Sequence, residues 1–152
     1  MIGGIVVMGR ERALELYGEG GYSPIPVAIV SIFSHDEHPP EFDNRLTPRG
    51  CYLKFDDVGK GEPYAMCEEQ VRLLLDFVQD VKKDESIKLP LVVQCPDGVS
   101  RSVGCAAAIG DVLGHDTSML WHDPTKCPNM YVYRLIRKVA GLDVTRVAGR
   151  FD

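Results

Sequence analysis

The chain has 152 residues, of which 45% are hydrophobic and 26% are charged, a mixture typical of a soluble globular domain with a substantial core. Its formal net charge is −5, so it has no basic excess with which to neutralise the phosphates of nucleic acid or of an anionic membrane. We therefore expect one domain over residues 1–152, whose partners are neither nucleic acid nor membrane.

The first half of the chain predicts three strands and one helix. Ile5–Met8 reads as a short buried strand, and Arg10–Tyr17 consists of strong helix formers that stop at a glycine. Ile25–Phe33 predicts a second buried strand with a proline near its start, where a missing hydrogen-bond donor is tolerated. Ser34–Gly50 is polar, rich in proline and expected to be irregular. Cys51–Phe55 alternates and predicts a third strand.

The second half predicts three helices around one further strand. Tyr64–Lys83 has apolar residues at steps of three and four, as in an amphipathic helix. Leu89–Val93 lacks alternation, which indicates a strand buried on both faces of a largely parallel sheet. Arg101–Leu113 is a helix whose alanines and glycines let it lie close to that sheet, and Asn129–Val139 predicts the last helix. The expected fold is α/β, with a central, mostly parallel sheet of four to five strands flanked by helices.

Cofactor and metal sites are not indicated. The 5 cysteines form an odd set without a C-x-x-C pair, which argues against a disulfide framework and a zinc knuckle. The cluster from His35 to His38 lies in a proline-flanked loop without a second group at metal-ligand spacing, which favours a solvated loop. We therefore expect no metal and no cofactor. No basic leader and no apolar stretch of about 20 residues occurs, which favours the cytoplasm.

The most informative segment runs from Leu91 to Ser102, with the sequence L-V-V-Q-C-P-D-G-V-S-R-S. A buried strand leads into Cys95, a short loop contains Gly98, and a helix begins at Arg101. Backbone N–H groups of such a loop converge on one point, where the helix dipole adds positive charge. The loop therefore predicts an anion site, and a cysteine in this field is expected to be a thiolate nucleophile at neutral pH.

Two further side chains of this segment have the chemistry that phosphoryl transfer needs. The planar guanidinium of Arg101 can bind two phosphate oxygens and follow them through the transition state. The hydroxyl of Ser102 can donate a hydrogen bond to the sulfur and help it leave. The predicted phosphate-binding residues are those of the loop itself: Pro96, Asp97, Gly98, Val99, Ser100 and Arg101.

The segment V-V-Q-C-P-D-G-V-S-R-S resembles the Cys-x5-Arg-Ser/Thr loop of the cysteine-dependent protein tyrosine phosphatase superfamily, in particular its small dual-specificity-like microbial members. The resemblance extends upstream to Y-L-K-F-D-D-V at Tyr52 and E-Q-V-R-L-L-L-D-F-V at Glu69, and covers about residues 50–140. It implies a phosphotyrosine-phosphatase-like fold and hydrolysis of a phosphorylated protein or a small phosphomonoester through a phosphocysteine.

Two positions depart from the family's pattern. The family usually has histidine before the nucleophile, where this chain has Gln94, so thiolate formation is expected to be weaker. Pro96 and Asp97 replace the residues that commonly precede the loop glycine. An acidic side chain there, with no lysine in the loop, disfavours polyphosphoinositides and 5′-triphosphate RNA relative to a phosphotyrosine-like monoester.

The leaving oxygen of a phosphate ester needs a proton, which a carboxylic acid can supply. Asp56 and Asp57 are the candidates, because they follow a strand on a loop that can close over the anion site, and the pattern of the resembling family favours Asp57. Asp123-Pro124 lies after the cysteine loop and is expected to form a surface turn. Asn129 is expected to cap the last helix, with polarisation of a water or bracing of the loop as the alternatives.

The leading hypothesis is a protein tyrosine or dual-specificity phosphatase with Cys95, Arg101, Asp57 and Ser102 as catalytic residues. A non-catalytic phosphopeptide-binding module is the main alternative, because of Gln94 and Asp97. A sulfurtransferase usually has a shorter active loop, and an arsenate reductase would need a paired resolving cysteine. Cys105 is expected to pack against the sheet, which leaves a resolving role as the lesser alternative.

Overall fold

The computed structural model describes residues 2–84 and 89–142, which form an α/β fold with one four-stranded, all-parallel sheet. The elements follow in the order β1 (Ile2–Gly9), α1 (Arg10–Tyr17), β2 (Ala28–Phe33), β3 (Arg49–Lys54), α2 (Glu68–Lys83), β4 (Leu89–Cys95), α3 (Arg101–Leu113), α4 (Ser118–His122) and α5 (Met130–Val139). The expected fold class is therefore confirmed.

The strand order β1-β4-β2-β3 determines where the functional residues meet. β4 lies between β1 and β2, and all three are parallel, so their carboxyl ends share one edge of the sheet. Gly9 at the end of β1 is the register partner of Cys95 at the end of β4. Ligand sites of open parallel sheets lie beyond this edge. The residues that follow β1, β2, β3 and β4 are therefore the ones placed to form a site.

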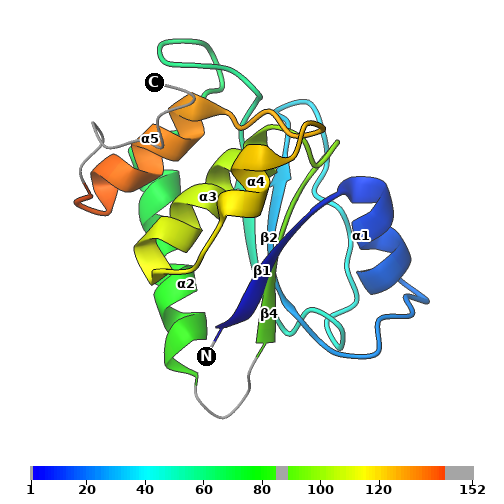
Figure 1. Cartoon of the computed structure of the whole chain (residues 1–152). Coiled ribbons are helices and arrows are strands. Elements are labelled where there is room, and N and C mark those ends of the chain that lie inside the picture. The colour runs from blue at the N-terminus through cyan, green and yellow to red at the C-terminus, as the bar shows by residue number, and fades with distance from the viewer. Residues whose placement is uncertain (1, 85–88, 143–152) are drawn as a thin grey trace.

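Helices cover both faces of the sheet (Figure 1). α1 packs on one face, over a small core that includes Ala13, Ile29 and Val92. The other four helices lie on the opposite face (Figure 1), where a larger core contains residues from β2, β4, α2, α3 and α5. Because side chains alternate along β4, Val93 and Cys95 face the larger core and Val92 faces the smaller one.

The small residues of α3 permit close packing, as the sequence predicts. Ala106, Ala107 and Ala108 are fully buried in the larger core, and so is Cys105, which packs as expected. A Cβ at Gly104 would lie 2.5 Å from the carbonyl oxygen of Asn129, so only glycine allows this approach. The consequence is that the start of α5 lies directly against α3, next to the cysteine loop.

The boundaries differ from the expected ones in physically understandable ways. β2 begins at Ala28 rather than Ile25, because the prolines just before it cannot donate to a ladder. α2 begins at Glu68 rather than Tyr64, whose φ of +64° is incompatible with a helix. The short helix α4 was not predicted; it buries Trp121, which is 6% exposed. Across the described residues, the helices are too short or too polar to cross a bilayer.

Candidate active site

Cys95 is the last residue of the central strand β4 and is fully buried. Its sulfur lies 3.0 Å from the hydroxyl oxygen of Ser102, on the first turn of α3. It also lies 3.6 Å from Oδ1 of Asp97 in the loop. The sulfur is thus in contact with two polar oxygens, and the hydroxyl that the sequence assigns to sulfur departure is within hydrogen-bonding distance.

The loop between β4 and α3 is held from outside through its carbonyl groups. Four of its carbonyl oxygens accept hydrogen bonds from surrounding elements: Pro96 from the N–H of Arg10 at 3.2 Å, Gly98 from the amine of Lys126 at 2.9 Å, Val99 from the N–H of Cys127 at 2.9 Å and Ser100 from the N–H of Asn129 at 3.0 Å. In a trans peptide the C=O and the following N–H point in opposite directions. The N–H groups that follow these carbonyls therefore point away from those partners, toward the inner side of the loop.

The side chain of Asp97 lies on this inner side of the loop. Its Oδ1 accepts a hydrogen bond from the N–H of Val99 at 3.2 Å and is the oxygen that lies 3.6 Å from the Cys95 sulfur. An oxygen of the chain's own carboxylate therefore contacts both a loop amide and the sulfur. Pro96, in contrast, has no N–H to offer, and its carbonyl is bonded to α1.

Gly98 is essential to the shape of the loop. Its φ is +70°, a conformation that strongly favours glycine. A Cβ there would also lie 2.5 Å from the backbone nitrogen of Gly9, so the loop is pressed against the end of β1.

Arg101 begins α3 with its side chain at the same edge of the sheet. The residue is 7% exposed, and its Nη1 donates to the hydroxyl of Ser34 at 2.8 Å and to the carbonyl of Phe55 at 2.9 Å. Its Nε and Nη2 make no hydrogen bond to any residue that the structure describes, and neither atom is fully enclosed. The anchored Nη1 therefore leaves the Nε–Nη2 edge available for two oxygens of a tetrahedral anion.

The two candidate acids have different partners. Oδ1 of Asp57 accepts hydrogen bonds from the Ser100 hydroxyl at 2.8 Å and from the Asn129 amide at 2.9 Å. Asp56 instead accepts the backbone N–H of His35 at 2.9 Å and contacts its Nδ1 at 2.7 Å. The backbone N–H of His35, followed by its ring, holds the pKa of the Asp56 carboxyl below its usual range. The structure therefore brings Asp57 to the cysteine loop and turns Asp56 toward His35.

Asn129 caps its own helix and also braces a neighbouring loop. Its Oδ1 accepts the N–H of Val132 at 3.0 Å and caps α5, as expected. Its Nδ2 donates to Asp57 and, at 3.2 Å, to the carbonyl of Val58. The cap of α5 is therefore also the brace of the loop that carries Asp57.

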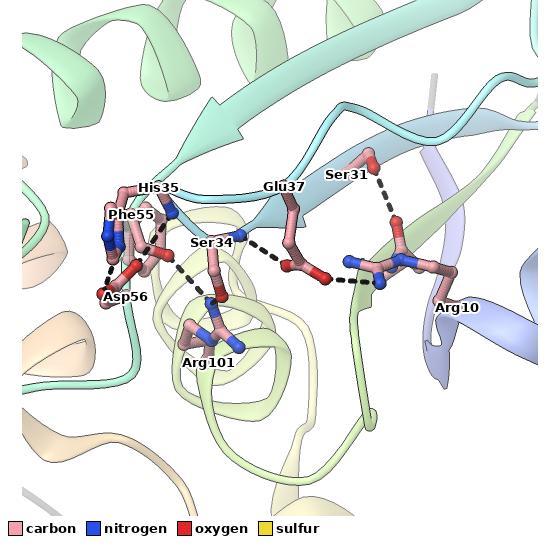
Figure 2. Close-up of polar contacts among 9 residues, drawn as sticks. Arg10, Ser31, Ser34, His35, Glu37, Phe55, Asp56 and Arg101 are labelled. Atoms are coloured by element: carbon pink, nitrogen blue, oxygen red, sulfur yellow. Dashed lines mark hydrogen bonds and ion pairs between the residues drawn. The ribbon is translucent and has the colours of Figure 1, made fainter.

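Sequence reasoning missed the contribution of the turn that follows β2. Ser34 binds Arg101, and Glu37 forms an ion pair with Arg10 at 2.7 Å (Figure 2). The hydrogen bond from Arg10, with one from the Ser34 N–H, lowers the pKa of Glu37 to about 2. His35, Asp36 and His38 are exposed, as expected for a solvated loop, whereas Glu37 is half-buried in its ion pair. Arg10 and Ser34 follow the carboxyl ends of β1 and β2, and the strand order, which no local sequence pattern specifies, places both ends beside that of β4.

Gln94, which stands where the resembling family usually has histidine, is fully buried. Its Oε1 accepts the hydroxyl of Ser31 at 2.6 Å, whereas its Nε2 has no hydrogen-bond partner in the part of the chain that the structure describes. By strand alternation it lies on the α1 face of β4, opposite to the side chain of Cys95. It therefore tethers β4 to β2 beneath the loop.

The remaining candidates lie outside the site. Asp123-Pro124 is a turn, as predicted, in which Asp123 accepts hydrogen bonds from Thr125. Within residues 2–84 and 89–142, no group of three or more histidine, cysteine or acidic side chains is arranged to hold a metal ion.

Comparison with models of known protein families finds none that matches this chain, and comparison with curated proteins finds no significant match. The functional inference therefore rests on the chain's own residues and geometry, together with the resemblance of its cysteine loop.

Proposed function

We propose that this protein hydrolyses phosphomonoesters through a phosphocysteine intermediate, as a tyrosine or dual-specificity phosphatase does. One observation carries the proposal. At the carboxyl end of the central strand, the Cys95 sulfur lies beside the Ser102 hydroxyl, and an anionic oxygen already lies between that sulfur and a loop amide. This arrangement fits a nucleophile at an oxyanion site.

In the first step the Cys95 thiolate attacks phosphorus and the P–O bond to the leaving group breaks. Asp57 gives its proton to the leaving oxygen, so the alcohol or phenol departs neutral. The Nε–Nη2 edge of Arg101 and the inner N–H groups of the loop bind the equatorial oxygens, whose charge they stabilise in the transition state. The product of this step is the S-phosphorylated enzyme.

In the second step a water molecule attacks the phosphocysteine. The Asp57 carboxylate takes a proton from the water, the P–S bond breaks, and Ser102 donates a hydrogen bond to the departing thiolate. Inorganic phosphate leaves and Asp57 is again protonated. The sum is phosphomonoester plus water giving alcohol plus phosphate, and no other reactant is needed.

The charges at the site favour a substrate with few negative charges. The Asp97 carboxylate lies at the anion position, and the loop contains no lysine. Each additional phosphate would add repulsion from Asp97 without gaining a cation in the loop. Protein phosphotyrosine, or another simple monoester, is therefore the substrate class that we propose.

Hydrolysis of p-nitrophenyl phosphate by the wild type and by Cys95→Ser tests the proposal. We expect turnover by the wild type, a loss of at least about a thousandfold in the variant, and an acid-labile phosphoryl adduct on Cys95 after rapid quenching. Equal rates for the two proteins would exclude the covalent mechanism.

A non-catalytic phosphopeptide-binding module is the second candidate. The position of the Asp97 carboxylate favours it, because a carboxylate oxygen in contact with the sulfur obstructs the approach of a phosphorus atom to that sulfur. Such a module would bind a phosphotyrosine peptide and inorganic phosphate but would release no phosphate from any monoester. Binding without turnover in the wild type would therefore decide for this alternative.

A further inference from the structure

The turn after β2 joins two arginines that come from opposite faces of the sheet. Ser34 accepts from Nη1 of Arg101 through its hydroxyl, while its N–H donates to Oε1 of Glu37 at 2.8 Å. The N–H of Glu37 donates back to the carbonyl of Ser34 at 3.1 Å, which closes the turn. The other carboxylate oxygen of Glu37 binds Arg10 at 2.7 Å. Figure 2 shows Ser34 between Arg101 and Glu37, and Glu37 between Ser34 and Arg10.

Among the described residues, no carboxylate is hydrogen-bonded to the buried guanidinium of Arg101, and Asp56 interacts with it only electrostatically. Its two acceptors, the Ser34 hydroxyl and the Phe55 carbonyl, are both neutral. Neutral acceptors fix the guanidinium without cancelling its charge, so the full charge is available to a phosphate. The position of the Ser34 hydroxyl depends on the turn that carries it, and Glu37 closes this turn.

The negative charge of Glu37 is neutralised by its ion pair with Arg10. An unpaired carboxylate bound to the N–H of Ser34, the residue that anchors Arg101, would repel an incoming phosphate. Arg10 neutralises this carboxylate, and its own position is fixed because its backbone N–H donates to the carbonyl of Pro96 in the cysteine loop. Nε and Nη2 of Arg10 are buried without hydrogen-bond partners, so its only side-chain acceptor among the described residues is Glu37.

We propose that Arg10, Glu37 and Ser34 form a positioning relay that holds Arg101 in the orientation that binds phosphate, with Arg10 shielding the phosphate from the charge of Glu37. The inference rests on the proposed function. None of the three relay residues is hydrogen-bonded to Cys95. Ser34 and Glu37 act through Arg101, whereas Arg10 also interacts electrostatically with Cys95.

The shielding role predicts an unusual order of effects among variants. Arg10→Met leaves an unpaired carboxylate on Ser34, the anchor of Arg101, whereas Glu37→Met removes that carboxylate together with its hydrogen bond to Ser34. We expect Arg10→Met to raise the KM for p-nitrophenyl phosphate and the inhibition constant of inorganic phosphate by roughly tenfold, and Glu37→Met by about threefold. The double variant should resemble Glu37→Met, so that the second substitution partly restores the first. Arg10→Lys should recover most of the loss.

A matched ion pair elsewhere in the fold provides the control. Arg137 binds Asp111 at 2.7 Å, and their side chains are 10% and 27% exposed, compared with 26% and 29% for Arg10 and Glu37. Arg137→Met should lower the urea midpoint of unfolding but leave the KM and the phosphate inhibition constant unchanged. Urea unfolding of every variant shows whether it is folded, so that KM values and phosphate inhibition constants are compared only between folded proteins.

The outcomes separate this inference from the function on which it rests. If the wild type neither binds inorganic phosphate nor hydrolyses the ester, the proposed function fails. If the wild type does both and the Arg10 and Glu37 substitutions are additive, or no larger in effect than Arg137→Met, the function stands and the relay is rejected.

Discussion

The Oδ1 atom of Asp97 lies 3.6 Å from the sulfur of Cys95 while it accepts the backbone N–H of Val99. The loop therefore binds a carboxylate of its own chain at the point where we propose that an oxygen of the phosphate binds. A substrate must displace this carboxylate or share the site with it, so Asp97 is expected to weaken the binding of phosphate.

Substitution of Asp97 by asparagine removes this charge but keeps an oxygen that can accept the Val99 N–H. We expect the KM for p-nitrophenyl phosphate and the inhibition constant of inorganic phosphate to fall about three- to tenfold, because the competing negative charge is gone. Asp116→Asn is the matched control, since Oδ1 of Asp116 accepts the N–H of Ser118 in the same way, outside the site. An unchanged or higher KM in Asp97→Asn would mean that this carboxylate does not oppose the substrate.

Ser102 is expected to act after the phosphocysteine has formed, because its hydroxyl lies 3.0 Å from the sulfur that must leave. Ser102→Ala should slow the second step by about tenfold or more, so that a burst of p-nitrophenol precedes slow turnover. Stopped-flow absorbance measures this burst, and Ser102→Thr, which keeps a hydroxyl, should reduce it. A loss of the first, fast phase instead would assign Ser102 to the attack.

The sequence predicted the cysteine loop because the loop's residues are contiguous and its flanks are strongly patterned. Strand β4 has no alternation, α3 is rich in alanine and glycine, and both lie where expected. The supporting residues were not predicted, because their partners are distant in the sequence: Arg101 and Ser34 are 67 residues apart, and Arg10 and Glu37 are 27 apart. Only the order of strands, β1-β4-β2-β3, brings these pairs together, and no local pattern specifies that order.

Asp57 and Asp56 can be distinguished by the leaving group. Asp57 is held by Ser100 and Asn129 at the loop, whereas Asp56 is bound to His35. In single-turnover measurements of the first step, Asp57→Asn should slow release of phenol from phenyl phosphate about a hundredfold, because phenolate is a poor leaving group, and release of p-nitrophenol from p-nitrophenyl phosphate much less. The second step, in which Asp57 acts as the base, should slow equally for both esters. Asp56→Asn should affect both esters alike and only slightly. The opposite pattern would make Asp56 the acid.

Gly98 and Gly114 separate the effect of a positive φ from the effect of a steric clash within the cysteine loop. Both have positive φ, +70° and +73°, but a Cβ at Gly114 would meet nothing within 4 Å, whereas one at Gly98 would lie 2.5 Å from a backbone nitrogen. Gly114→Ala should cost about 1 kcal/mol of unfolding free energy and leave turnover unchanged. Gly98→Ala should cost about 2–4 kcal/mol and also abolish phosphate binding, because the loop must move. Urea unfolding and phosphate inhibition measure the two effects, and equal effects in both variants would contradict the role given to Gly98.

The ion pair between Glu37 and Arg10 should make the stability of the fold depend on pH in the acid range. The hydrogen bond from Arg10 lowers the pKa of Glu37 from 4.5 to about 2. Because the folded-state pKa is the lower one, the contribution is fully present above about pH 4.5 and is lost as the pH falls toward 2. Because the Glu37 side chain is 29% exposed, solvent screening limits this contribution to about 1–2 kcal/mol.

Urea unfolding between pH 7 and 3 tests this dependence. The free energy of unfolding of the wild type should exceed that of Glu37→Gln at pH 7, and the difference should shrink on acidification. Arg10→Met, which lacks the cation, should lack most of this dependence, and a constant difference between wild type and Glu37→Gln down to pH 3 would show that the pair does not form in solution.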